Sequence, residues 1–233
     1  MPPFTITEIA PRIFEARMDA EARGLSFNQY FLRGEKTALI SLGTAQMFEG
    51  IRGAIESLGG KTTLDYLVIP HFEGDECGSL SRWLALYPQA TPVCAEPCSR
   101  QLAGFGLHPT PRVVGDGESL DLGGLELEFL LTPFEVHLWD GLMALERTSG
   151  MLFSSDLFMQ RGNPPVTADS LAEVDPGKVE TSSIPARRKL RATLERLASL
   201  TISAVAPGHG AVLKFDPRPL IATLKDQAEP RFN

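Results

Sequence analysis

The order of predicted strands and helices indicates an α/β (α+β) fold: a four-layer αββα sandwich, or else a less layered mixed α+β domain. Three observations support this class. Strands come first, then strands and helices alternate, and a second run of strands is followed by helices. Of the 233 residues, 43% are hydrophobic and 22% charged, which suffices for a large buried core. Neither an internal repeat nor a linker divides the chain, so we predict a single domain over residues 1–233.

The first half of the chain begins with strands and continues with alternating elements. Strands are predicted at 4–9, 13–16, 26–32 and 37–41, separated by turns at 10–12 and 34–36. Apolar residues at helical spacing predict a helix over 46–58 that ends at Gly59 and Gly60. A buried strand at 64–69, a helix at 77–86, a strand at 92–95 and a short helix at 97–103 follow.

The second half repeats this order with a long polar interruption. Strands are predicted at 112–114, 119–122, 125–131, 142–148 and 151–154. Residues 159–185 are polar and proline-rich, and so long a connection indicates either a lid over a site or a surface insertion. A basic amphipathic helix at 186–200, a short strand at 202–206 and a helix at 219–228 complete the prediction.

Charge and cysteine content exclude several classes of protein. The balance of 22 basic and 29 acidic residues gives a formal charge of −7, which argues against nucleic-acid and anionic-membrane partners. There is no basic-then-apolar leader and no run of about 20 apolar residues, so we expect a soluble, cytoplasmic protein without a membrane span. With only three cysteines, we expect Cys94 and Cys98 to be structural thiols.

One loop concentrates groups that bind metals. His71, Glu73, Asp75 and Glu76 directly follow the predicted strand at 64–69. Acidic side chains at this point could simply favour the N-terminus of the next helix through its dipole. However, three more metal-competent side chains, His137, Asp156 and His209, each follow a different predicted strand. Side chains just past strand ends meet at one rim of a sheet, so the sequence predicts a metal site there. His108 lies outside this scheme, and we expect a surface turn residue.

This combination of residues resembles the metallo-β-lactamase fold, in the variant carried by flavodiiron proteins and oxygen-binding di-iron proteins. The resemblance covers nearly the whole chain. It includes Asn28 to Leu32, the pattern His71-x-Glu73-x-Asp75, Cys77 to Leu80, His137, Leu152 to Asp156 and His209. The hydrolytic zinc branch has a second histidine where Glu73 stands, so Glu73 favours the di-iron branch.

The resemblance implies two iron ions and their ligands. One ion would take His71, Glu73 and His137, and the other Asp75, residue 76 and His209, with Asp156 bridging. Replacing imidazoles by carboxylates favours iron or manganese over zinc. Four carboxylates and three neutral imidazoles carry a charge of −4, which two divalent ions neutralise. Phe72, Phe134 and Trp139 are candidates for an apolar pocket wall, although core packing is the more ordinary role for each.

Glu76 departs from the family pattern, which has histidine at this position. If Glu76 binds metal, its charge favours the ferric state and lowers the reduction potential. If it does not, the second metal site is weak. Carboxylate is a sound iron ligand, so we favour binding.

The resemblance implies a di-iron protein that binds or reduces O2 or NO. No glycine-rich phosphate loop follows a strand and the chain ends after its last helix, so we expect no bound flavin. Electrons would then come from a separate electron-transfer protein. The alternatives are a metal-dependent hydrolase of the same fold, in which Asp75 orients a metal-bound hydroxide, and a non-catalytic O2-sensing module. A head-to-tail homodimer is compatible with the resemblance.

Overall fold

Two sheets of seven strands form the middle of the molecule, as seen in a computed structural model that describes residues 3–107, 109–132, 141–162, 164–181 and 187–227. The first sheet has the order β1-β2-β3-β4-β5-β6-β7: Thr5–Ala10, Ile13–Ala20, Leu25–Arg33, Thr37–Ile40, Tyr66–Val68, Thr91–Cys94 and Arg112–Val113. The second has the order β12-β14-β13-β11-β10-β9-β8: Thr167–Ala168, Val212–Leu213, Ala204–Pro207, Met151–Ser155, Leu142–Glu146, Glu126–Leu131 and Ser119–Asp121.

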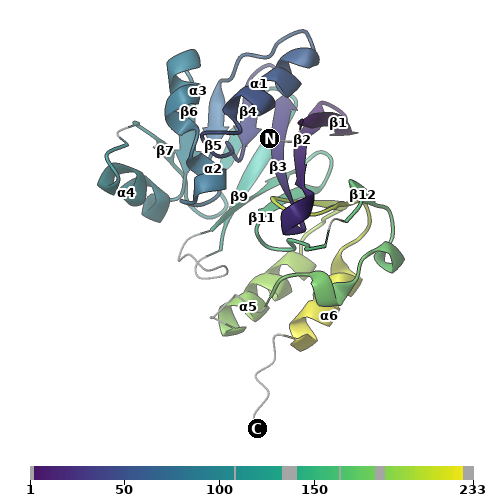
Figure 1. Cartoon of the computed structure of the whole chain (residues 1–233). Helices are drawn as coiled ribbons and strands as arrows, with labels where there is room; N and C mark the ends of the chain where they lie inside the picture. Colours follow the sequence, from purple (N-terminus) through teal and green to yellow (C-terminus); the bar gives the residue numbers. More distant parts are fainter. Residues whose placement is uncertain (1–2, 108, 133–140, 163, 182–186, 228–233) are drawn as a thin grey trace.

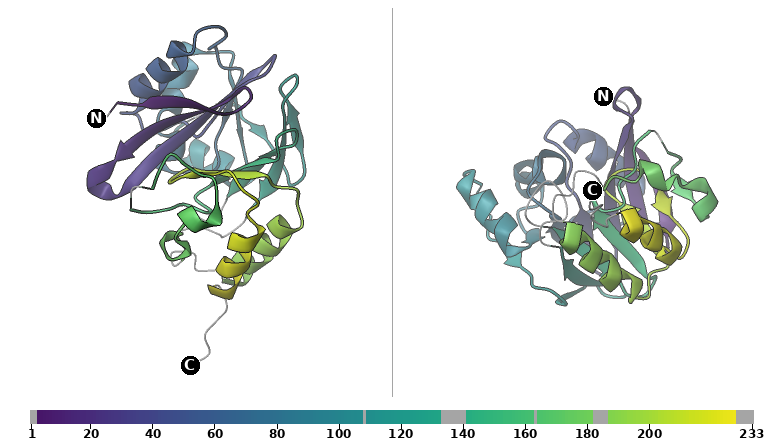
Figure 2. Two further views of the ribbon diagram at one scale, coloured as in Figure 1. Left: turned by 90° about the vertical axis from the view of Figure 1, so that its right-hand side faces the viewer. Right: turned by 90° about the horizontal axis from the view of Figure 1, so that it is seen from below.

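Helices cover the outer face of each sheet (Figures 1 and 2). The first sheet carries α1 (Phe48–Ser57), α2 (Gly74–Cys77), α3 (Leu80–Leu86) and α4 (Glu96–Gly104), and the second carries α5 (Arg187–Ala198) and α6 (Arg218–Gln227). Short 3-10 turns lie at Glu21–Arg23, Leu171–Glu173 and Pro176–Lys178. Among the described residues, no helix combines the length and apolarity needed to cross a membrane.

Three hydrophobic cores separate the four layers. One lies between the sheets and includes Tyr30, Phe129 and Phe153. A second joins the first sheet to its helices through residues such as Ile51 and Trp83, and a third joins the second sheet to α5 and α6. The predicted four-layer αββα sandwich is therefore confirmed.

The helix predicted over 77–86 is wrong at its start, because two helices occupy this region. Between α2 and α3 the chain leaves helical geometry at Ser79, with φ −97° and ψ 6°, next to Gly78, where a Cβ atom would lie 2.3 Å from the carbonyl oxygen of Gly74. The hydroxyl of Ser79 donates to the carbonyl of Leu42, which fixes the start of α3. This break lets α2 form a separate turn next to the acidic loop.

The sequence prediction missed the short strands β12 and β14 at one edge of the second sheet. They have two residues each, too few to produce a readable alternation. β12 belongs to the polar segment 159–185, in which Val174 and Val179 are buried in the core under α5 and α6. Much of this segment is therefore packed onto the second sheet.

Glu15 on β2 is a fully buried acid between the sheets. It lies opposite Tyr30 of β3, and both of its carboxylate oxygens have no hydrogen-bond partner within the described part of the chain. Burial raises the pKa of Glu15 to about 8, although the nearby Arg17 guanidinium partly offsets this effect. The native protein thus holds a proton on Glu15 at neutral pH.

Glu15→Gln should stabilise the protein relative to the wild type as pH rises. Between its usual acidic pKa and about 8, Glu15 is protonated when folded and ionised when unfolded, so the wild type loses stability through this window. The difference in free energy of unfolding should grow by up to about 1.4 kcal/mol per pH unit, measured by urea unfolding.

Glu146→Gln is the matched control for this measurement. Glu146 is equally buried, but it accepts hydrogen bonds from Glu126, Thr148 and Ser149, and its pKa is lowered. Its difference from the wild type should stay constant above neutral pH. A constant difference for Glu15→Gln as well would contradict the prediction.

Candidate metal centre

The acidic loop comes from the first sheet and is held rigidly. It follows β5 and turns into α2, where the amides of Glu76 and Cys77 both donate to the carbonyl of Glu73. The backbone amide of Leu42 donates to the carbonyl of Glu76, which ties α2 to the sheet. The Glu73 side chain makes no capping hydrogen bond to α2. Asp75 and Glu76 do lie in the first turn of α2, where the helix dipole favours their negative charge.

His71 is buried and points its Nε2 atom at carboxylates. Nε2 lies 3.0 Å from Oε2 of Glu73 and 3.7 Å from Oδ2 of Asp156. On the other side of the ring, Nδ1 lies 3.0 Å from the hydroxyl oxygen of Ser155. His71, Glu73 and Asp156 each offer one atom that can bind a metal, and these three atoms lie within 4.8 Å of one another. The three residues could therefore hold a metal ion.

His209 is buried on the second sheet's side in a matching arrangement. Its Nδ1 lies 2.7 Å from the carbonyl oxygen of Ser26, and because a carbonyl only accepts, Nδ1 carries a proton. Nε2 faces Oδ2 of Asp75 at 3.3 Å and Oδ1 of Asp156 at 3.5 Å. This hydrogen bond to Ser26 leaves Nε2 as the metal-binding nitrogen.

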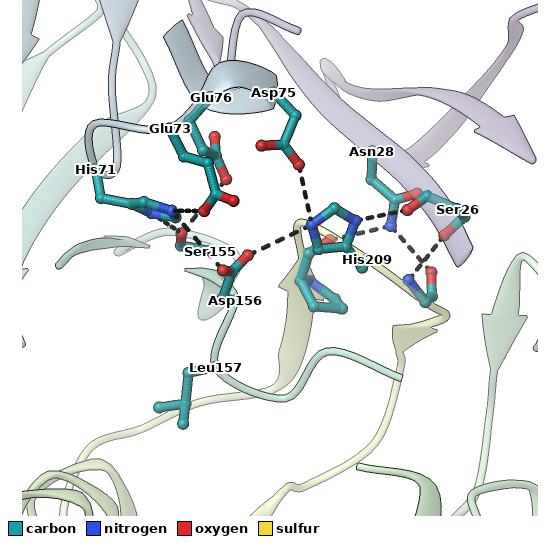
Figure 3. A network of polar contacts seen from close by, with 12 residues as sticks. Ser26, Asn28, His71, Glu73, Asp75, Glu76, Ser155, Asp156, Leu157 and His209 are labelled. Atoms are coloured by element: carbon teal, nitrogen blue, oxygen red, sulfur yellow. Dashed lines mark hydrogen bonds and ion pairs between the residues drawn. The ribbon is translucent and has the colours of Figure 1, made fainter. Parts of the chain in front are cut away.

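Asp156 lies between the two histidines (Figure 3). Its Oδ2 faces His71 and its Oδ1 faces His209. The parallel strands β11 and β13 bring Asp156 and His209 to the same edge of the second sheet, because each residue follows the end of its strand. The geometry is that of a carboxylate shared by two neighbouring sites.

Glu76 also faces the cluster and is 3% exposed. Its Oε1 accepts from the Ser155 hydroxyl at 3.4 Å, whereas Oε2 has no hydrogen-bond partner among the residues that the structure describes. A buried carboxylate oxygen without a partner is costly. A metal ion near Oε2 would remove that cost.

The structure thus brings together six of the seven predicted site residues: His71, Glu73, Asp75, Glu76, Asp156 and His209. His137, the seventh, lies outside the described residues, as do Phe134, Trp139 and His108. All three cysteines are buried and none forms a disulfide, in line with the structural role expected of Cys94 and Cys98.

Sequence reasoning missed Ser155 and Ser26, which contact the Nδ1 atoms of His71 and His209, respectively. Ser155 directly precedes Asp156, so its proximity to the site could have been inferred. Ser26 acts through its backbone carbonyl on β3. A backbone contact between residues 183 positions apart leaves no signal in the sequence.

The protonation of the histidines reflects the surrounding negative charge. Burial alone lowers the pKa of His71, but the hydrogen bond to Glu73 and the charges of Glu76 and Asp156 outweigh it and raise the pKa to about 9. The pKa of His209 is likewise raised well above its usual value, because Asp156 and Asp75 outweigh burial. Burial raises the pKa of Glu76 to about 7. Without metal, protons supply the positive charge that this cluster requires.

The residues fit a pair of hard divalent cations. Carboxylates outnumber imidazoles, a donor set that suits iron or manganese. Asp156 is placed to serve both ions, and Oε2 of Glu76 needs a positive partner. The chemistry of the donors and their burial therefore match the predicted metal site.

A cavity of about 710 Å³ opens over the cluster. Its apolar lining includes Met18, Leu25, Phe27, Met47 and Met159, and its polar lining includes Glu73, Asp75, Asp156 and His209. Phe72 does not line this cavity but packs against Phe105, with 4.8 Å between ring centroids, so core packing describes it better than a pocket wall. Met159 and Arg161, at the start of segment 159–185, do line it.

Comparison with known proteins agrees with this geometry. The profile of the family described as "ODP family beta lactamase" matches residues 25–210. A putative diflavin flavoprotein A 2 from Synechocystis sp. is 32% identical over 82% of this chain and 34% of its own length. An anaerobic nitric oxide reductase flavorubredoxin from Pectobacterium carotovorum is 30% identical over 85% of this chain and 42% of its own length. The chain thus spans about a third to two fifths of these curated relatives.

Solved structures show the same fold. A variant of the flavo di-iron protein from Thermotoga maritima has a TM-score of 0.87 at 25% identity, covering 100% of this chain and 63% of its own. Rubredoxin oxygen:oxidoreductase from Desulfovibrio gigas has a TM-score of 0.83 at 20% identity, covering 96% of this chain and 61% of its own.

Two sheets with imidazoles and carboxylates gathered at their common rim define the metallo-β-lactamase-like class, in the form found in flavodiiron cores. Within that class, the chain belongs to the ODP family of β-lactamase-type proteins. The resemblance inferred from the sequence is confirmed.

Metal binding should release protons, and the metal affinity should therefore increase as the pH rises. At neutral pH, His71 and His209 each carry an extra proton in the metal-free protein, and a metal ion must displace it. Calorimetric titration in buffers of different ionisation heat should detect about two protons from these residues per fully loaded chain. Affinity that does not change between pH 6 and pH 8 would contradict this assignment.

Proposed function

We propose that this chain holds two iron ions and uses them to bind and reduce O2 or NO, with electrons from a separate redox protein. The observation that carries the proposal is the position of Asp156, whose two oxygens face different histidines. The relatives support it by name, since they include a nitric oxide reductase flavorubredoxin and an oxygen oxidoreductase.

The residues divide into two sets around Asp156. We assign His71, Glu73 and His137 to one ion, and Asp75, Glu76 and His209 to the other, with Asp156 bridging. The distances within the described part of the chain support each set, because Glu73 faces His71 at 3.0 Å and Asp75 faces His209 at 3.3 Å. Ligands from both sheets and from positions 71 to 209 contribute to one site, which supports our proposal of a single domain over 1–233.

A bound iron pair supplies one-electron redox chemistry and open positions for a diatomic ligand. The chain's own residues orient and enclose the site. Ser155 and the Ser26 carbonyl fix the two imidazole rings, while Met18, Phe27 and Met47 give the cavity an apolar wall that disfavours water. Arg23 and Arg161 also line the cavity, which is large enough to admit a diatomic molecule such as O2 or NO.

Glu76 is proposed as a ligand rather than a bystander. Its burial and its unpartnered Oε2 support a role in which a cation compensates its charge. A carboxylate in place of a neutral imidazole adds one negative charge to the site. This charge stabilises the ferric over the ferrous state and so lowers the reduction potential.

Protein produced with iron available should contain two iron ions per chain. After anaerobic reduction, exposure to O2 or NO should change its optical and electron paramagnetic resonance spectra, with turnover when a reductant is in excess. Bound zinc alone, without spectral change on oxygenation, would refute the di-iron proposal. Binding without turnover would instead favour an O2-sensing module, and rapid ester or lactone cleavage a hydrolase.

Glu76→His should raise the reduction potential of the centre, because it replaces a carboxylate by a neutral imidazole. Redox titration followed by electron paramagnetic resonance measures the potential. Glu118→Gln is a suitable control, since Glu118 is an exposed acid outside the proposed set of ligands and its loss should leave the potential unchanged. An unchanged potential in Glu76→His, with two ions bound, would exclude Glu76 as a ligand.

A further inference from the structure

The loop that carries His209, residues 207–210, is bound across the gap between the sheets by the β2–β3 ribbon. The backbone amide of Asn28 donates to the carbonyl of Gly208 at 2.9 Å, and the amide of Gly210 donates to the Ser26 hydroxyl at 2.8 Å. The Tyr30 hydroxyl donates to the carbonyl of Pro207 at 2.6 Å.

The side chain of Asn28 joins the two ends of this loop. It is 1% exposed, and its Nδ2 donates to the carbonyl of Pro207 at 3.0 Å and to that of Gly210 at 2.9 Å. Its Oδ1 has no hydrogen-bond partner in the described part of the chain. The side chain is therefore held by its donors, and an amide nitrogen with two hydrogens is the group that can serve both carbonyls.

Arg17 of β2 also donates to the carbonyl of Gly210, the second of these two carbonyls. Its guanidinium is 3% exposed and donates to the carbonyl of Gly210 at 2.9 Å, and also to the carbonyls of Pro164 and Pro165. Asp19, 2.7 Å away, balances its charge. A buried cation is thus committed to backbone carbonyls beside His209.

These contacts fix a backbone that would otherwise be free to move. Gly210 has a φ of +106°, and a Cβ atom there would lie 2.7 Å from Gln160, so the loop needs glycine. Glycine lacks the steric restriction that would define its own conformation. The carbonyl of His209 accepts from the amide of Gln160, so every carbonyl from 207 to 210 has a donor.

We propose that Asn28 and Arg17 are positioning residues that hold His209 in place for the metal ion it shares with Asp75. The inference rests on the proposed metal centre. Neither side chain is a proposed ligand; both act through the loop backbone. In Figure 3, Asn28 and Ser26 lie on the side of His209 away from Asp75 and Asp156, where they can set the ring's position without blocking the metal.

The test is the affinity of each metal position in Asn28→Ala. Iron(II) or manganese(II) titrated into the metal-free protein should bind the His209 position about 10- to 100-fold more weakly, with binding at the His71 position unchanged. Arg17→Lys, which keeps the charge but loses the planar fork, should weaken the same position in the same direction. Asn28→Ala removes contacts to the carbonyls of Pro207 and Gly210, and Arg17→Lys changes the contact to the carbonyl of Gly210. Both variants leave every proposed ligand in place.

Tyr30→Phe is the matched control. It removes a buried hydrogen bond to the carbonyl of Pro207 and a 3.4 Å contact with Nδ2 of Asn28, but it leaves the hydrogen bonds from Asn28 and Arg17 to the carbonyl of Gly210 in place. Its two metal affinities should equal those of the wild type. Equal weakening in Tyr30→Phe would mean that any lost contact between the sheets has this effect, which would overturn the specific role of Asn28.

Hydrogen exchange separates this inference from the proposed function. In metal-free protein, the Gly210 amide should exchange at least about tenfold faster in Asn28→Ala than in the wild type. If the wild type binds no metal pair but the Gly210 amide exchanges faster in Asn28→Ala, the proposed function fails, whereas the role of Asn28 in holding the loop at 207–210 is supported. If exchange and both metal affinities are unchanged in Asn28→Ala, the inference is wrong. Should Asn28→Ala not fold, Arg17→Lys decides the matter by the same two measurements.

Discussion

The buried negative charge at the junction of the two sheets is the constraint on which the rest of the site depends. Glu76 and Asp156 are almost fully buried, and Glu73 and Asp75 lie beside them. Carboxylates in such a place require cations, hydrogen-bond donors or protons. In the metal-free protein, the pKa values of His71 and His209 are raised, so both imidazoles stay protonated to a higher pH than usual. The same groups are ready to exchange those protons for metal ions.

The negative charge is concentrated at one place because side chains from both sheets meet there. The first sheet supplies His71 to Glu76, and the second supplies Asp156 and His209. Neither set alone is a complete site. The apolar core between the sheets, with Tyr30 and Phe153 in contact, brings the layers together but does not fix single side chains to a fraction of an ångström. Directional hydrogen bonds supply that precision: His209 donates to the carbonyl of Ser26, and Asn28 and Arg17 donate to the carbonyls of the loop.

Polar groups within the interior thus have distinct roles. Arg17 is neutralised by Asp19 and binds carbonyls, whereas Glu15, two residues earlier on the same strand, has no hydrogen-bond partner among the described residues and stays protonated. Glu146 in the other sheet accepts several backbone hydrogen bonds and keeps its charge. The two buried glutamates therefore differ in charge state because one has hydrogen-bond donors around it and the other has none among the described residues.

Much of this architecture could be predicted from the sequence. Strand and helix periodicity is local information, so the four layers, most of the elements and the placement of metal-binding residues after strand ends all followed from it. The misplaced start at residue 77 had a tertiary cause, since the chain between α2 and α3 packs against residues 42–44 and Ser79, which leaves helical geometry, donates to the carbonyl of Leu42. β12 and β14 escaped prediction because two-residue strands exist only through pairing with distant partners.

The sequence by itself determined which side chains could bind metal, because the residue types and their positions after strands are properties of the chain. Only the tertiary structure decided how they combine. Asp156 faces His209 because β11 and β13 are parallel neighbours, and it faces His71 because the loop after β5 of the first sheet reaches the same rim. Each histidine presents Nε2 because Ser155 or Ser26 engages its Nδ1. These contacts join residues 84 and 183 positions apart, and such distances in the chain become proximity only when the two sheets pack together.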